Sequence, residues 1–264
     1  MTFVELPTLT QMLWGLLLAT QVALLGLLVW HGSYLRLRLF TLYVALNIVQ
    51  GVFLAVIYPR WGFHSLLAWQ TAWASQTLVI IARAGAMAEL CALAISQFRG
   101  IWGLAWRVLL FSGLFILSVS IILGRHDFRV VVLTLDQGVE LAIAAVCVGL
   151  FVFVKYYRLK MEKPLRLIGL GFCLYSCVFA LNNALVVRLS SRYLEIWKHL
   201  NTLTFLGVVS LFIWAALSPM AVTTEKPVLL AAEVYGRVIP EIHQQLSALN
   251  DQLSRVWKRQ SLHP

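Results

Sequence analysis

Residues 10–30 read TQMLWGLLLATQVALLGLLVW and contain no Asp, Glu, Lys or Arg. A helix of about 20 mainly apolar residues is long enough to cross the hydrocarbon core of a bilayer. Because the bilayer offers the backbone no hydrogen-bond partners, a segment that enters it must satisfy its own amides as a helix. This stretch therefore predicts a membrane-spanning helix.

Six further runs of the same kind follow along the chain, separated by polar or turn-forming residues. They are 40–58, 75–97, 101–123, 130–154, 165–187 and 197–217. Pro59, Gly100, Gly124 and Pro219 stand where a helix should end. Before the third run the apolar character extends back to Leu66, so 65–74 is either a helical extension or a separate interfacial segment. We predict an all-α, polytopic protein with seven transmembrane helices in residues 1–218.

The composition excludes most other classes of protein. Apolar residues make up 61% of the chain and charged residues 12%, with a mean hydropathy of +0.84. Soluble domains contain about 45–50% apolar and about 25% charged residues. Aromatic residues at 12% also exclude a disordered chain. The net charge is +10, but the sequence contains no nucleic-acid-binding motif. We therefore expect the lipid bilayer as a partner and no nucleic acid.

The distribution of Lys and Arg predicts the orientation, because positive residues next to spans are retained in the cytoplasm. Fourteen lie in the connections on the side of the C-terminus, namely Arg36, Arg38, Arg99, Arg107, Lys155, Arg158, Lys160, Lys163, Arg166, Lys226, Arg237, Arg255, Lys258 and Arg259. Six lie on the other side, namely Arg60, Arg125, Arg129, Arg188, Arg192 and Lys198. We predict a bacterial inner-membrane protein with its N-terminus outside and its C-terminus in the cytoplasm. Glu5, with no Lys or Arg before the first span, argues against a cleavable signal peptide.

Four acidic or basic residues fall in the predicted spans away from their ends: Arg83 and Glu89 in the third, Asp136 and Glu140 in the fifth. Such residues are costly in hydrocarbon and usually pair with one another or line a wet cavity. Counted at about 1.5 Å per residue from the outer end, Arg83, Asp136 and Glu140 lie at similar depth. A carboxylate pair beside an arginine can bind a cation or a proton. We expect a polar centre that contains Arg83, Glu89, Asp136 and Glu140.

Other polar residues gather in the outer and middle layers of the predicted spans. They are Thr20, Gln21, Asn47, Gln50, Gln137, Asn182, Asn183, His199 and Asn201. The inner halves of the last three spans are nearly pure hydrocarbon. The polar centre, which includes Asn182 and Asn183, is therefore either a ligand or proton site near the outer face or a closed hydrogen-bonded network that ties helices together. Small residues around Arg83 predict that the third span is the central helix.

Signatures of catalysis and cofactor binding are absent from the sequence. We find no metalloprotease, serine-hydrolase, phosphate-binding-loop or dinucleotide motif, and expect no catalytic residue, cofactor or metal site. Cys173 and Cys177 share a helix face, but no third soft ligand follows nearby, and packing between helices explains them. A retinal pigment would need a lysine deep in the last span, whereas Lys198 lies at its outer end. The protein is more consistent with a non-enzymatic role.

The tail, residues 219–264, predicts a cytoplasmic amphipathic helix at about 239–258, with Pro240 in its first turn. Its apolar positions alternate in steps of four and three: Tyr235, Ile239, Ile242, Leu246, Leu249, Leu253 and Val256. This heptad seam fits a coiled coil with a second copy or with a separate membrane or cytoplasmic partner. An interfacial helix under the bilayer, helped by Trp257, Lys258 and Arg259, fits equally well.

Three features carry a resemblance to known proteins: YLRLRLFTLY at 34–43, MAEL at 87–90 and the amphipathic end at 246–256. On these the chain resembles a group of uncharacterised seven-helix bacterial membrane proteins of the acidobacterial type, and no activity follows from that. The layout is also similar to the seven-helix sensor modules of bacterial kinases, where a coiled coil follows the helices. No effector domain follows here, so the resemblance implies signalling through a separate partner.

We expect a sensor-like or accessory, assembly-type membrane protein with an outer polar site and a tail helix for association. The alternative is a small transporter or ion or proton pathway through Arg83, Glu89, Asp136 and Glu140. A pathway requires polar residues on the inner side as well, and the sequence shows few there.

Overall fold

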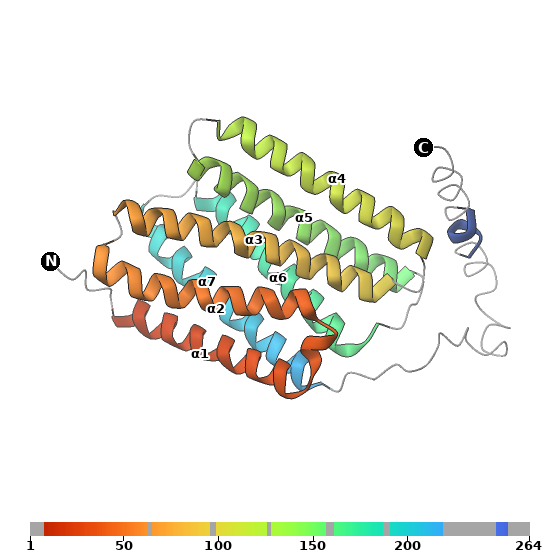
Figure 1. Cartoon of the computed structure of the whole chain (residues 1–264), viewed down its shortest axis with the longest axis horizontal. Coiled ribbons are helices and arrows are strands. Elements are labelled where there is room, and N and C mark those ends of the chain that lie inside the picture. The colour runs from red at the N-terminus through yellow and green to blue at the C-terminus, as the bar shows by residue number, and fades with distance from the viewer. Residues whose placement is uncertain are drawn as a thin grey trace.

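The computed structural model describes residues 8–62, 65–95, 99–125, 128–156, 161–186, 191–218 and 247–252. Within these ranges the chain is helical and contains no strand (Figure 1). The long helices are α1 (Thr8–Trp30), α2 (Arg38–Trp61), α3 (Leu66–Ile95), α4 (Arg99–Leu123), α5 (Phe128–Tyr156), α6 (Lys163–Val186) and α7 (Ser191–Leu217). A 3-10 turn, η1 (Ser33–Leu35), lies between α1 and α2.

The expected fold class is confirmed, because seven helices of the described chain are long and apolar enough to span a membrane. The ends of two helices differ from the prediction, and the start of a third was left open by the sequence. Helix α2 continues past Pro59 and stops at Gly62, whose φ of 74° breaks the helix. Gly100 lies in the first turn of α4 and does not separate two segments. Leu66 begins one continuous α3, so the helical extension is the correct alternative.

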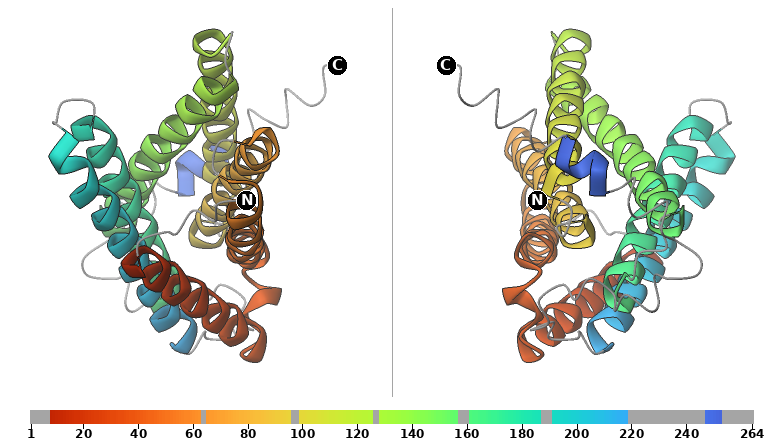
Figure 2. Two further views of the ribbon diagram at one scale, coloured as in Figure 1. Left: turned by 90° about the vertical axis from the view of Figure 1, so that its left-hand side faces the viewer. Right: turned by 90° about the vertical axis from the view of Figure 1, so that its right-hand side faces the viewer.

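Helix α3 is the central helix, as its small residues predict. It packs against α2, α4, α5 and α6. Half of the residues in its most apolar stretch are buried, which is the largest share among the seven candidate spans. Helix α4 is the least buried of the seven, because 6% of its most apolar stretch is buried. It stands at the edge of the bundle beside α5 (Figures 1 and 2). The buried core therefore lies between α3 and the helices around it, and it includes α7 and, through Leu24 and Leu28, α1.

An aromatic cluster of Phe40, Tyr43, Phe172 and Phe212 fills the bundle near the η1 end of α2. The Phe40 ring packs edge-on against Phe212 and Phe172, with centroids 5.1 and 6.0 Å away. Tyr43 and Phe172 have centroids 5.7 Å apart. Gly171 makes room for this packing, since a Cβ there would lie 2.5 Å from Phe212 Cε1. The four rings join α2, α6 and α7 into a tight layer, called here the aromatic seal.

The predicted orientation and the role of the tail stay predictions. Of the tail positions, Leu249 lies in a short described helical stretch, 247–252, where it is 47% exposed. The other predicted association residues, Ile239, Ile242, Leu246, Leu253 and Val256, lie outside the described residues.

Candidate functional site

Arg83 on α3 meets both acidic residues of α5 in the middle of the bundle. Its Nη1 atom lies 3.5 Å from Asp136 Oδ1 and forms a closer ion pair with Glu140 Oε1. Asp136 and Glu140 are one helical turn apart, which places both carboxylates on the face of α5 that α3 covers. We call these three side chains the ion cluster.

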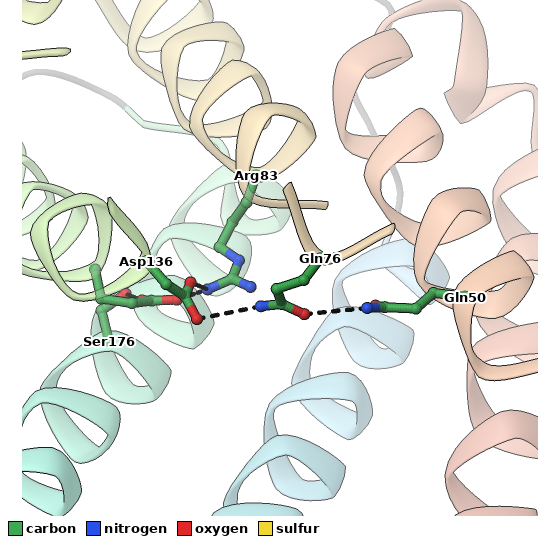
Figure 3. Close-up of polar contacts among 6 residues, drawn as sticks. Gln50, Gln76, Arg83, Asp136 and Ser176 are labelled. Carbon is green, nitrogen blue, oxygen red and sulfur yellow. Dashed lines mark hydrogen bonds and ion pairs between the residues drawn. The ribbon is translucent and has the colours of Figure 1, made fainter. Parts of the chain in front are cut away.

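Three uncharged side chains extend the ion cluster to neighbouring helices (Figure 3). Gln50 Nε2 on α2 donates to Gln76 Oε1 on α3 at 3.1 Å, and Gln76 Nε2 donates to Asp136 Oδ2 at 3.1 Å. On the far side, the Ser176 hydroxyl on α6 donates to Glu140 Oε2. One polar chain therefore connects α2, α3, α5 and α6.

The ion cluster is closed. Arg83 is 4% exposed, Asp136 8% and Glu140 0%. The Arg83 guanidinium carbon lies 5.5 Å from the centroid of the Tyr175 ring and 5.9 Å from that of Tyr43, so aromatic faces cover it. These contacts join α3, α5 and α6 within the bundle, and the role of the cluster as a ligand or proton site stays a prediction. The buried Arg83 Nε atom has no hydrogen-bond acceptor.

The two ends of the polar chain have different surroundings. Gln50 lines a cavity of about 420 Å³ between α2 and α3, together with Gln70, Thr71 and Ser75, on the side of the α2–α3 connection. On the opposite side, Tyr43 of the aromatic seal covers Arg83 and packs against Phe172. The ion cluster is thus linked by glutamines toward one face of the bundle and separated from the other by aromatic rings.

The structure does not bring Glu89 to the ion cluster. Its two carboxylate oxygens accept the backbone amides of Leu39 at 3.1 Å and Phe40 at 2.9 Å, in the first turn of α2. The N-cap residue of that helix, Leu37, makes no side-chain cap. Glu89 therefore caps α2 from a neighbouring helix, where its charge also complements the helix dipole.

We expect Glu89→Leu to destabilise the protein by about 1 kcal/mol, because two amides of α2 lose their acceptor. Glu89→Gln keeps one acceptor oxygen and should lose roughly half as much. The measurement is the free energy of unfolding in detergent. Equal losses for the two variants would contradict the capping role.

The remaining predicted polar residues do not join the ion cluster in the described part of the structure. Asn182 and Asn183 lie on α6, but their side chains are outside what the structure describes. Thr20 and Asn47 hydrogen-bond to the backbone of their own helices. Asn201 has a buried Oδ1 without a hydrogen-bond donor.

The described residues contain no group of three His, Cys, Asp or Glu side chains that could hold a metal ion. The four cysteines are free thiols, and Cys147 Sγ lies 3.5 Å from Met87 Sδ on α3. These contacts fit packing between helices.

Sequence reasoning missed Gln76, Ser176 and the two tyrosines of the site. A signal existed for Gln76, which precedes Arg83 by two helical turns and so shares its face of α3. Ser176, Tyr43 and Tyr175 carry no comparable signal, because their position depends on how α2 and α6 are rotated in the bundle.

No protein-family model, no curated protein and no solved structure matches the chain. The resemblance to acidobacterial-type proteins and to sensor modules stays a prediction, and the chain is described by its own geometry as a multi-pass bundle of seven membrane-spanning helices around a buried ion cluster.

Proposed function

We propose that this protein is a non-enzymatic, sensor-like membrane protein whose ion cluster binds a proton and whose tail passes the response to a partner. The single observation behind this is the composition of the cluster, with two carboxylates around one guanidinium in a buried site. When all three are ionised the site has one unbalanced negative charge, and an unbalanced buried charge is expensive. A proton on one carboxyl removes that cost.

Asp136 is the group we assign to this proton exchange. Glu140 forms the closer contact with Arg83 and accepts the Ser176 hydroxyl, and both contacts favour its ionised form against the cost of its complete burial. Asp136 is more exposed than Glu140 and lies farther from Arg83. It accepts a hydrogen bond from Gln76, which in turn is bonded to Gln50 on α2. The cavity at Gln50 supplies the approach from the α2–α3 side.

A sensor needs a conformational consequence, and the cluster supports one. Its bonds hold α3, α5 and α6 together and reach α2 through Gln76. Loss of the proton changes the charge at the centre of this connection, so the relative stability of alternative helix arrangements changes with it. In this proposal the tail helix, through Leu246, Leu249 and Leu253, couples that change to a second copy or a partner.

The proposal predicts a pH dependence with a definite sign. In the range where the cluster gives up its proton, the folded protein binds one more proton than the unfolded chain, so stability falls as the pH rises. We expect the unfolding temperature of the wild-type protein to decrease as the pH rises above about 4, where the carboxyl of an unfolded Asp has lost its proton. Asp136→Asn, which mimics the protonated group, should keep its stability across that range.

Glu162→Gln is the matched control. Glu162 forms a two-pronged ion pair with Arg36 at 2.8 Å, partly exposed and outside the ion cluster. This variant should retain the wild-type pH dependence. A wild-type protein whose unfolding temperature does not change with pH, or an Asp136→Asn variant that changes as the wild type does, would refute the proton site.

Transport by the same residues is the alternative function, and the aromatic seal argues against a continuous path through the described bundle. Reconstitution in proteoliposomes separates the two. Proton flux that Asp136→Asn abolishes would favour the transporter, and no flux with an intact pH response would favour the sensor.

A further inference from the structure

The glutamines Gln50 and Gln76 join the ion cluster to the cavity between α2 and α3 (Figure 3). An amide group has a direction, because its nitrogen donates hydrogen bonds and its oxygen accepts them. Gln50 Nε2 donates to Gln76 Oε1, and Gln76 Nε2 donates to Asp136 Oδ2, each at 3.1 Å. Both amides therefore donate toward Asp136. This direction fits an ionised Asp136, since a carboxylate can only accept.

A proton on Asp136 reverses what its side chain needs. Asp136 Oδ1 is buried, has no hydrogen-bond partner in the described part of the structure and lies 3.5 Å from Arg83 Nη1, a cationic group that cannot accept. Gln76 lies at the other oxygen, Oδ2, which is therefore the atom where an acidic hydrogen can find an acceptor. With Gln76 as it stands, the new hydroxyl would face its Nε2 group, donor against donor, and an unsatisfied donor in a buried site is costly.

We propose that the proton on Asp136 reverses the amides of both glutamines. A half-turn about the Cγ–Cδ bond of Gln76 brings its Oε1 toward the Asp136 hydroxyl and its Nε2 toward Gln50. Gln50 turns in the same way, and its Oε1 then accepts from Gln76 Nε2. The one covalent change is the proton gained by Oδ2, and the chain has two hydrogen bonds in either direction. This relay, as we call the two glutamines, rests on the proposed proton site and adds how the state of that site reaches the cavity.

The reversal changes what Gln50 offers to the cavity. Gln50 is half-buried and lines the cavity together with Gln70 and Ser75. While Asp136 is ionised, Nε2 of Gln50 is held by Gln76, and Oε1 is left to accept. Once Asp136 is protonated, Oε1 is held and Nε2 is left to donate. The cavity therefore presents an acceptor in one state of the ion cluster and a donor in the other, and a polar molecule that hydrogen-bonds to Gln50 distinguishes the two states.

Asp136 faces groups from each helix that packs against α5. Arg83 from α3 and Glu140 from α5 itself are the charged ones. Glu140 has both oxygens engaged, one by Arg83 and the other by the Ser176 hydroxyl of α6. On α4 the side chain that approaches α5 at this level is the apolar Ile116. Further ionisable side chains of the described structure cover Arg83 from α2 and α6, namely Tyr43 and Tyr175.

The test measures hydrogen exchange of the glutamine side chains by NMR, in the full-length isotope-labelled protein in nanodiscs. The slower of the two Gln50 Nε2 hydrogens is compared with that of Gln70, an exposed side chain that lines the same cavity. Base-catalysed exchange slows for both as the pH falls, so the ratio of the two rates removes this common effect. We expect the ratio to rise about tenfold as the pH falls through the range in which the unfolding temperature changes, because Gln50 Nε2 loses one hydrogen bond.

Gln76→Met removes the middle amide of the relay and should make the ratio independent of pH. Thr77→Val is the matched control on α3, because the Thr77 hydroxyl bonds to the Trp73 carbonyl of its own helix, and this variant should behave as the wild type. A constant ratio in a wild-type protein whose unfolding temperature does change with pH would overturn the relay and leave the proton site intact. An unfolding temperature that does not change with pH would overturn the proton site, and the relay with it.

Discussion

Replacing Arg83 with methionine should lower the free energy of unfolding by about 3–5 kcal/mol, because it leaves two carboxylates buried without their cation. Met keeps most of the volume, so the loss reports charge and hydrogen bonding more than packing. Arg83 is 4% exposed and pairs with Asp136 and Glu140, which makes solvent screening small. Unfolding of the purified protein by SDS titration measures the effect.

Neutralising the partners should rescue this loss. The triple variant Arg83→Met, Asp136→Asn, Glu140→Gln contains no unbalanced charge, and replacing a whole buried ionic group is often nearly neutral. Arg60→Met, an exposed arginine in the last turn of α2, should change stability by less than about 0.5 kcal/mol. An Arg83→Met protein as stable as the wild type, or one that the triple variant fails to rescue, would show that the ion pairs contribute little.

Replacing Phe172 with alanine should lower the free energy of unfolding by about 3–5 kcal/mol. Phe172 is 1% exposed and contacts Phe40, Tyr43 and Phe212 from three directions. Because these neighbours come from α2 and α7, the structure cannot close the resulting cavity without moving a helix. The same variant should raise the proton permeability of proteoliposomes, since the seal beside the ion cluster is opened.

Phe115→Ala is the control for packing. Phe115 on α4 is 70% exposed, so the substitution removes the same atoms from a site that leaves no internal cavity. We expect little change in stability and none in proton permeability. If Phe172→Ala and Phe115→Ala lose the same stability, or if Phe172→Ala vesicles stay as tight to protons as the wild type, the aromatic layer is not a seal.

Part of the site could be read from the sequence because it follows from single helices. Asp136 and Glu140 are i, i+4 neighbours on one helix face. Because the third and fifth spans cross the membrane in the same direction, counting residues from their outer ends places Arg83 at the same depth. The position of Glu89 could not be derived in this way. It lies on α3 six residues after Arg83, and six residues turn the helix far from the first position, toward the start of α2. The depth of an acidic residue in the membrane does not show whether it caps a neighbouring helix or joins the ion cluster.

The sequence by itself determined that this chain is a helical membrane protein with seven spans. Hydrocarbon leaves an apolar segment of this length no other way to satisfy its backbone, so a local property decides the fold class. Only the tertiary structure decided that Gln76 and Ser176 complete the ion cluster and that Glu89 caps α2. These contacts join residues from 36 to 60 positions apart in the chain. They depend on the rotation and spacing of packed helices, which side-chain volumes set collectively and no single span encodes.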